Sequence, residues 1–133
     1  MAIADAAGLP AAACLAGASV HEVKLAETAL DSLFIAEKPE KLIGDKAYDS
    51  DKLDDDLMKN QGVEMAVPHR RNRTKPKTQD GRKLRRHQRR WKVGRLFAWL
   101  LNFRRLVVRH ERHADNFLAF FLLACSVILP RFF

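Results

Sequence analysis

The sequence predicts an α/β layer fold with a mixed sheet and flanking helices, and three observations support this. Short apolar stretches alternate with segments of helical spacing over residues 1–68. Residues 70–81 contain no aliphatic or aromatic side chain, and two apolar helices are expected after them. Such alternation of strands and helices is typical of α/β layers. The 133 residues suit one domain or a large piece of one.

The first half of the chain carries the expected strands. Two apolar stretches, residues 2–5 and 11–18, flank the Gly8-Leu9-Pro10 turn, which favours a hairpin. Apolar residues then recur at helical spacing over residues 25–34. The hairpin is therefore expected to be followed by a helix.

A second set of alternating elements follows. The short apolar run 41–44 predicts a buried strand, and residues 63–67 predict another. Between them, Ser50 or Asp51 can accept the first N–H groups of a helix over residues 51–60.

The second half is expected to be helical. A long helix should begin at residue 82, because apolar residues recur at steps of three and four: Val93, Leu96, Phe97, Leu100, Phe103 and Val107. The apolar run 116–129 follows a polar connecting segment, residues 111–115. It is shorter than the ~20 residues of a membrane span, so we expect a buried core helix and no membrane partner.

Charge divides the chain into an acidic and a basic part. Residues 1–64 hold 6 Lys and 13 Asp or Glu, whereas residues 65–133 hold 18 Lys or Arg and 3 acids. We therefore expect one partial domain made of an acidic strand and helix part (1–68), a basic, solvated and mobile loop (69–82) and two C-terminal helices (83–133). Two cysteines, Cys14 and Cys125, lack the spacing of a zinc ribbon or a disulfide framework and fit a reducing cytoplasm.

Residues 69–95 hold thirteen Lys or Arg and one acid. Such a surface neutralises phosphates and releases counterions, so the segment predicts DNA binding over the alternative of an ordinary solvated face. The expected DNA contacts are Arg70, Arg71, Arg73, Lys75, Lys77, Arg85, Arg86, Arg89 and Arg90. Trp91, Trp99 and Phe103 could stack on bases, but they share the spacing of the apolar face, which favours core positions.

Asp45 is the carboxylate best placed for chemistry. It follows the predicted strand 41–44, and α/β folds place their active sites at such strand ends. The acids at residues 51 and 54–56 are explained by the first turns of a helix, where negative charge is favourable. From the residues alone, Asp45 can equally be a metal ligand or an ordinary surface acid.

Four strings resemble those of bacterial insertion-sequence DDE transposases of the family-five branch. KLIGDKAYDSD (41–51) is similar to their second catalytic-aspartate motif, and VPHRRNR (67–73) to their basic loop. Residues 90–106 resemble their catalytic-glutamate helix, and 111–117 lead into their last apolar helix. The resemblance covers essentially the whole chain. It implies an RNase H-like fold and metal-dependent cutting and joining of DNA strands.

In this family three acids, Asp, Asp and Glu, hold two divalent metals, usually Mg²⁺ (or Mn²⁺), as the resemblance implies. It places Asp45 as the second acid, the one expected catalytic and metal-binding residue. No residue here matches the strand that carries the first aspartate, so we expect an N-terminally truncated domain missing its first strand. Gly94 stands at the glutamate position, and His87 stands where the family has tyrosine.

The sequence therefore predicts a truncated transposase fragment that is catalytically inactive and does not bind Mg²⁺ stably. The alternative is a basic DNA-binding or interaction fragment that acts with or against an intact transposase. Expected partners are DNA, at transposon ends and along the phosphate backbone, and another copy or an intact transposase. The expected location is the bacterial cytoplasm, with nucleoid association when the chain is bound to DNA.

Overall fold

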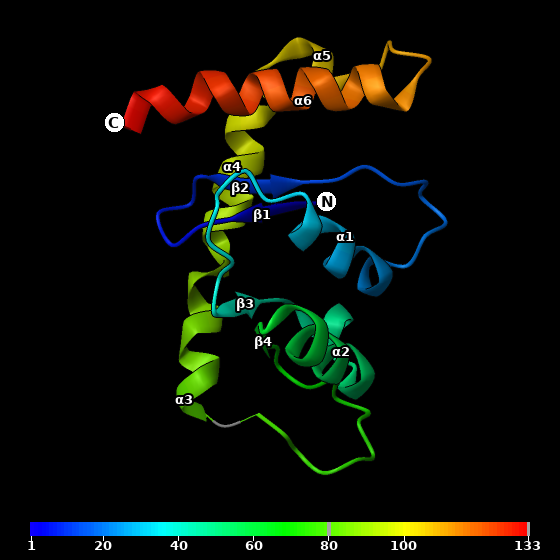
Figure 1. Cartoon of the computed structure of the whole chain (residues 1–133), viewed down its shortest axis with the longest axis vertical. Helices are drawn as coiled ribbons and strands as arrows, with labels where there is room; N and C mark the ends of the chain where they lie inside the picture. Colours follow the sequence, from blue (N-terminus) through cyan, green and yellow to red (C-terminus); the bar gives the residue numbers. More distant parts are fainter. Residues whose placement is uncertain (80, 133) are drawn as a thin grey trace.

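The computed structural model describes residues 1–79 and 81–132, without the side chains of Lys83 and Arg86. It has a mixed α/β architecture, as predicted (Figure 1). The strands, however, form two separate two-stranded sheets in the described residues rather than one mixed sheet. One sheet is antiparallel and the other is parallel. The prediction of a single continuous sheet is therefore wrong, because no described strand joins the two pairs.

The first sheet is the predicted hairpin. Strand β1 (Ala2–Ala4) pairs with β2 (Pro10–Ala13), and Ile3 lies opposite Ala12. Asp5 closes the turn, since its side chain accepts hydrogen bonds from the backbone N–H groups of Ala7 and Leu9, each at 2.8 Å. Helix α1 (Leu25–Asp31) packs beside β2.

The second sheet joins β3 (Lys41–Ile43) and β4 (Glu64–Ala66) through helix α2 (Asp51–Gln61). The Ser50 hydroxyl accepts the Leu53 N–H at 3.4 Å and caps α2, as predicted. Gly62 ends α2 with φ at +68°, a left-handed conformation that favours glycine.

The predicted long helix is a run of three segments. Helix α3 (Gly81–Leu84) continues into a 3-10 helix (Arg85–Arg90) and then into α4 (Trp91–Leu100). Figure 1 shows this run passing alongside both sheets. The short helix α5 (Arg104–Val107) and the long α6 (Ala114–Ile128) follow, with α6 crossing the end of α4. The run therefore connects the parallel sheet to the C-terminal helices.

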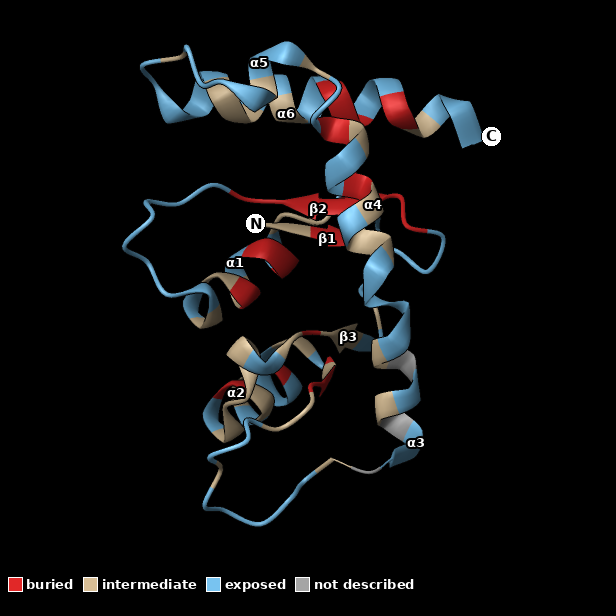
Figure 2. Cartoon of the chain, turned by 180° about the vertical axis from the view of Figure 1, so that it is seen from behind, coloured by how far each residue is buried: buried red, intermediate tan, exposed pale blue. Residues whose placement is uncertain are grey.

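Two apolar clusters hold the fold together (Figure 2). The larger one joins both sheets to α1 and α2 and includes Ile3, Leu30, Leu57 and Val63. The smaller one joins α4 to α6, and Ala2 and Ala4 of β1 pack against it. Because β1 touches both clusters, it links the two halves of the molecule.

Helix α6 is largely uncovered, so the prediction of a buried core helix is wrong for most of its length. Its buried residues are Ala124, Cys125 and Ile128, which form one stripe against α4. Among the described residues, one helical segment, Ala114–Phe132, is long and apolar enough to cross a membrane, a criterion that core helices also meet. The apolar composition of α6 therefore does not indicate how much of it is covered.

Both cysteines are buried and free, as expected. Burial raises the pKa of the Cys125 thiol to about 11. The thiolate needed for reactivity is therefore scarce at neutral pH.

Candidate functional site

Asp45 lies just beyond β3, at the carboxyl end of the strand. Its Oδ1 atom accepts the Ala47 N–H at 2.8 Å, which caps the 3-10 helix Lys46–Tyr48. Its Oδ2 atom lies 3.5 Å from the Arg90 Nη1 atom, and the Asp45 side chain is about one-third exposed. The carboxylate is thus held by the backbone on one side and faces an arginine on the other.

Close packing behind Asp45 fixes this strand end. A Cβ atom added at Gly44 would lie 2.7 Å from Met65 and 3.2 Å from both Tyr48 and Val67. Tyr48 has its pKa raised to about 12 by burial and by the negative charges of Glu22 and Asp45. The tyrosine therefore stays neutral at physiological pH, and its ring packs against the larger apolar cluster.

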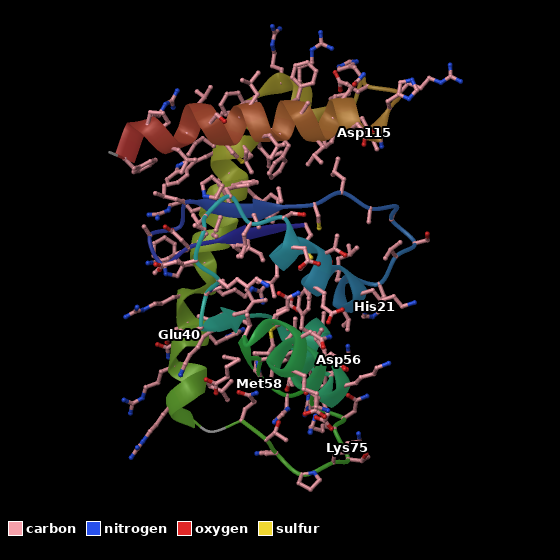
Figure 3. The ribbon with its side chains drawn as sticks, in the orientation of Figure 1. His21, Glu40, Asp56, Met58, Lys75 and Asp115 are labelled. Carbon is pink, nitrogen blue, oxygen red and sulfur yellow. The ribbon has the colours of Figure 1, made fainter. Side chains whose placement is uncertain are left out.

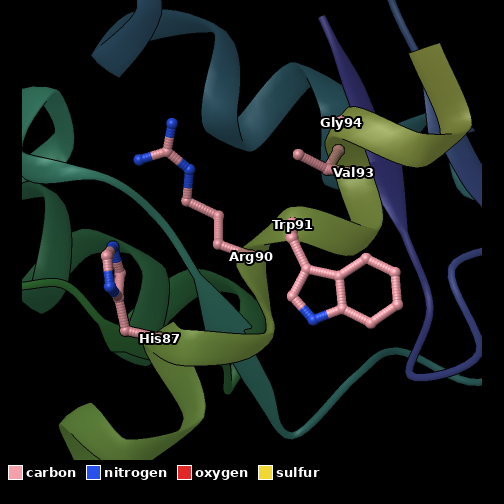
Figure 4. Close-up of a pocket in the computed structure, with 5 residues that line it drawn as sticks. All are labelled: His87, Arg90, Trp91, Val93 and Gly94. Atoms are coloured by element: carbon pink, nitrogen blue, oxygen red, sulfur yellow. The ribbon is translucent and has the colours of Figure 1, made fainter. Parts of the chain in front are cut away.

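A hollow of about 380 Å³ lies next to Arg90 on the helical run. Its lining residues are His87, Arg90, Trp91, Val93 and Gly94 (Figure 4). Gly94 follows Arg90 by one helical turn, and a Cβ atom added there would meet nothing within 4 Å. A longer side chain at position 94 therefore has room on the same side of the helix as Arg90.

The residues around Asp45 do not fit a divalent metal. No group of three His, Cys, Asp or Glu capable of holding a metal occurs in the described part of the chain. The charged neighbour of Asp45 is the guanidinium of Arg90, and position 94 supplies no carboxylate. Mg²⁺ prefers several oxygen ligands, which a single carboxylate cannot provide.

A second charged cluster anchors the basic loop to α2. Asp49 Oδ1 accepts a hydrogen bond from His69 Nδ1 at 2.8 Å and pairs with Arg73 Nη1 at 3.0 Å. Asp49 Oδ2 accepts the Arg70 N–H at 2.7 Å. The side chains of Asp49 and Arg73 are only 6% and 11% exposed. This cluster anchors the loop, whereas most of the loop residues are exposed, as predicted.

His69 closes the loop on itself. Its Nε2 atom lies within hydrogen-bond distance of the Thr78 and Gln79 N–H groups, at 3.1 and 3.3 Å. Since Nε2 accepts, the proton of a neutral imidazole must sit on Nδ1, which donates to Asp49. The two ends of the loop therefore meet at one side chain.

The loop also neutralises the start of α2. Asp51 pairs with Arg73 at 2.6 Å and with Lys75 at 3.1 Å, and these contacts lower the pKa of the Asp51 carboxyl. Burial alone would raise the pKa of Asp49, but the hydrogen bonds from Arg70 and His69 outweigh it and lower the pKa. Figure 3 shows Lys75 on the loop below α2.

The predicted DNA contacts fall into two groups. Four have partners within the chain: Arg73 and Lys75 in these ion pairs, Arg90 with Asp45, and Arg70, which donates to the carbonyls of Lys46 and Ala47. Four are exposed and have no ion pair among the described residues: Arg71, Lys77, Arg85 and Arg89. The side chain of Arg86 lies outside the described residues.

Sequence reasoning misplaced Trp91 and missed two anchoring cations. Trp91 is 59% exposed, so its predicted core position is wrong, whereas Trp99 and Phe103 pack against the smaller cluster as expected. Lys92 and Arg95 donate hydrogen bonds to the carbonyls of Ala6 and Ala7 in the hairpin turn. No sequence signal could find these contacts, because they join segments more than eighty residues apart.

The comparisons with known proteins agree with this architecture. The model of the family described as "Transposase DDE domain" matches residues 1–129. A putative transposase for insertion sequence element IS402 from Burkholderia cepacia is 34% identical over 134 residues. The alignment covers 95% of this chain but only 59% of that relative, and no solved structure matches. The chain therefore belongs to the family of insertion-sequence transposase DDE domains.

Proposed function

We propose that this chain is part of a transposase catalytic domain that contacts DNA and contributes Asp45, but that it cannot cut DNA on its own. The observation that carries this proposal is the setting of Asp45. Asp45 stands at the end of β3, and its Oδ2 atom lies 3.5 Å from the Nη1 atom of Arg90. Arg90 belongs to the helical run that also carries Gly94. The expected second acid thus faces the expected glutamate helix, which presents glycine in place of a carboxylate.

An RNase H-like origin with one strand lacking is supported by the two separate sheets. Strand β1 pairs only with β2, and β3 pairs only with β4, within the described residues. Figure 1 places β1 on the side of its sheet that is nearer to β3. One further strand between β1 and β3 would join the two sheets into one mixed sheet.

The family uses a divalent metal, and the part of this chain that the structure describes brings together no set of carboxylates to hold one. We therefore propose that neither Mg²⁺ nor Mn²⁺ binds stably at Asp45 in this chain alone. The guanidinium of Arg90 supplies the positive charge beside the Asp45 carboxylate. The arginines of this chain can orient a DNA phosphate, but no described residue supplies a second acid beside Asp45 for hydrolysis.

The second function to consider is DNA binding without chemistry, with or against an intact transposase in the cytoplasm. The observation that favours it is the set of four exposed cations, Arg71, Lys77, Arg85 and Arg89, which have no ion pair with another described residue. They lie on the basic loop and on the 3-10 helix that adjoins it. Phosphate contacts of this kind supply sequence-independent affinity that depends on salt.

The test compares two variants that each lose four positive charges. The first is Arg71→Gln/Lys77→Gln/Arg85→Gln/Arg89→Gln, and the control is Lys24→Gln/Lys52→Gln/Lys59→Gln/Arg104→Gln. Duplex affinity is measured by fluorescence anisotropy between about 50 and 200 mM salt. We expect the first variant to bind more weakly and to lose up to about four units of salt slope, roughly one for each phosphate contact removed.

The control removes the same charge from other surfaces, so it should keep most of the slope. Equal losses in both variants would mean that net charge, rather than this surface, drives binding. Unchanged binding in the first variant would reject the proposed contacts.

A further inference from the structure

Helix α6 has one face that no described part of the chain covers. Figure 1 shows α6 at one end of the molecule, beyond both sheets. Its buried stripe, Ala124, Cys125 and Ile128, packs toward α4. The opposite face carries exposed apolar side chains, of which Leu123 is 60% and Val127 is 40% exposed. Neighbouring apolar side chains that remain exposed are typical of an interaction surface.

The uncovered face is organised as one row of residues spaced four apart, which we call the α6 row. Its members are all exposed: Asp115, Ala119, Leu123, Val127 and Arg131. Residues four apart lie on the same side of a helix, so the row follows one side of α6 and of the 3-10 turn that continues it. Figure 3 shows Asp115 at the start of the helix. The two ends of the row carry opposite charges, and residues 116–130 between them include no charged side chain.

The arginines that precede α6 lie against a different side of the helix. The guanidinium carbon of Arg105 lies 5.5 Å from the centre of the Phe120 ring, and that of Arg109 lies 5.8 Å from the centre of the Phe117 ring. These cations are therefore already in contact with the chain's own aromatic rings. The two charges at the ends of the α6 row, in contrast, have no ion pair within the part of the chain that the structure describes.

We propose that the α6 row binds the same row of a second copy of the chain, in antiparallel orientation. A two-fold axis at Leu123 brings Leu123 against Leu123 of the second copy and the small Ala119 against the larger Val127. At each end, Asp115 then meets Arg131 of the second copy. A parallel pair would instead bring like charges together at both ends, which is unfavourable. The contact goes beyond the proposed DNA function and does not depend on it.

The size of α6 sets the strength of this contact. Its 15 residues span about 22 Å, and the strip that one helix presents is about 10 Å wide. Such a strip is smaller than the ~800 Å² that each partner buries in a stable complex, so we expect a weak, concentration-dependent dimer. A lipid surface matches the row less well, because one acid and one base leave no net positive charge to attract anionic lipids.

The first experiment follows the mass of the full chain by sedimentation equilibrium, from about 1 μM to about 1 mM. We expect the unaltered chain to dimerise across this range. Leu123→Glu brings two carboxylates together at the axis and should weaken dimerisation at least about tenfold. Leu101→Glu is the control, since Leu101 is 55% exposed but lies outside α6. A monomer at every concentration, or an equal loss in both variants, would overturn the proposal.

Reversing the end charges tests the antiparallel register. Asp115→Arg and Arg131→Asp each bring like charges together, so each should weaken dimerisation roughly twofold to fivefold. The double variant Asp115→Arg/Arg131→Asp restores opposite charges and should recover most of the affinity. Both substitutions oppose the helix dipole, so such a recovery cannot come from a more stable helix. A double variant that dimerises no better than the single variants would contradict the register.

Disulfide formation under mild oxidation gives an independent measure of orientation. Leu123→Cys should form a cross-linked dimer, because its two copies meet at the axis. Val127→Cys should not, since antiparallel helices separate its two copies by about 12 Å, too far for a disulfide. The native cysteines, Cys14 and Cys125, are both buried and contribute little background. Cross-linking through Val127→Cys in preference to Leu123→Cys would overturn the antiparallel pair.

Two further outcomes identify what else could be wrong. If the chain stays monomeric but binds phosphatidylglycerol vesicles, and Leu123→Glu abolishes that binding, the face contacts a lipid surface and the proposal is wrong. Dimerisation is measured without DNA. A chain that dimerises through α6 but binds no DNA would therefore contradict the proposed function and leave this inference intact.

Discussion

Gly94 is the residue at which the resemblance to DDE transposases predicts a glutamate. The glycine sits inside α4, where it lowers helix stability by about 1 kcal/mol relative to alanine. An added Cβ atom there meets no neighbour within 4 Å. The position thus has space for the carboxylate that the resemblance expects, and nothing in the packing requires glycine.

We expect Gly94→Ala to raise the free energy of unfolding by about 1 kcal/mol, measured by urea denaturation. Gly62→Ala is the matched control. Its φ of +68° is unfavourable for alanine, so that variant should lose stability. A loss of stability in Gly94→Ala would show that the glycine is needed for packing.

Asp54 makes the stability of the folded chain depend on pH. Burial, together with the charges of Asp51 and Asp49, raises its pKa from 3.8 to about 6. The folded chain therefore binds this proton more tightly than the unfolded chain. The stabilising contribution is full below about pH 4 and is lost as the pH rises through about 6.

Asp54→Asn should accordingly raise the free energy of unfolding at pH 7 by about 1 kcal/mol, a value discounted for partial exposure. The gain should shrink toward pH 4, where Asp54 is already protonated. Urea denaturation at both pH values measures it, with Asp55→Asn as an exposed control from the same helix turn. An equal gain at both pH values would contradict the assigned pKa.

At the scale of elements, the basic loop is a structured connection rather than a free arm. Asp49 contacts His69, Arg70 and Arg73. His69 in turn accepts a hydrogen bond from the Thr78 N–H at the other end of the loop. The lowered pKa of Asp49 means that its contacts are intact above its ordinary range and are lost as the pH falls through its folded-state pKa. Acid should therefore release the loop.

We expect Asp49→Asn to increase the rate of trypsin cleavage within residues 70–79 severalfold at neutral pH. The substitution removes the charge that holds Arg73 and weakens the acceptor for Arg70 and His69. Asp56→Asn, within α2 and without a loop contact among the described residues, serves as the control. Cleavage at the unaltered rate would mean that other contacts hold the loop.

Local signals in the sequence were enough to predict the elements that depend on neighbouring residues. Ser50 and Gly62 fix the two ends of α2, and the Gly8 turn fixes the hairpin. The loop could not be predicted, since its anchor Asp49 lies some twenty residues away. The exposure of most of α6 was not predicted either, because the apolar composition of a helix does not show which of its faces packs against another element.

At the scale of the whole molecule, the resemblance predicts the chemistry of the site, and the structure shows what surrounds the predicted residues. Asp45 and Gly94 were named from the sequence, whereas the pairing of Asp45 with Arg90 depends on the packing of β3 against the helical run. Trp91 was misplaced because its spacing matches the apolar face, yet that face turns toward solvent at this point.

The strand cleavage assay is the most direct test of the central claim, that this chain contacts DNA but cannot cut it. The purified chain is incubated with end-labelled DNA and Mg²⁺ or Mn²⁺, and binding and cleavage are followed in the same sample. We predict salt-dependent binding and no cleavage above background, with the unaltered chain and Asp45→Ala indistinguishable in cleavage. Metal-dependent cleavage that is abolished by Asp45→Ala would contradict the account.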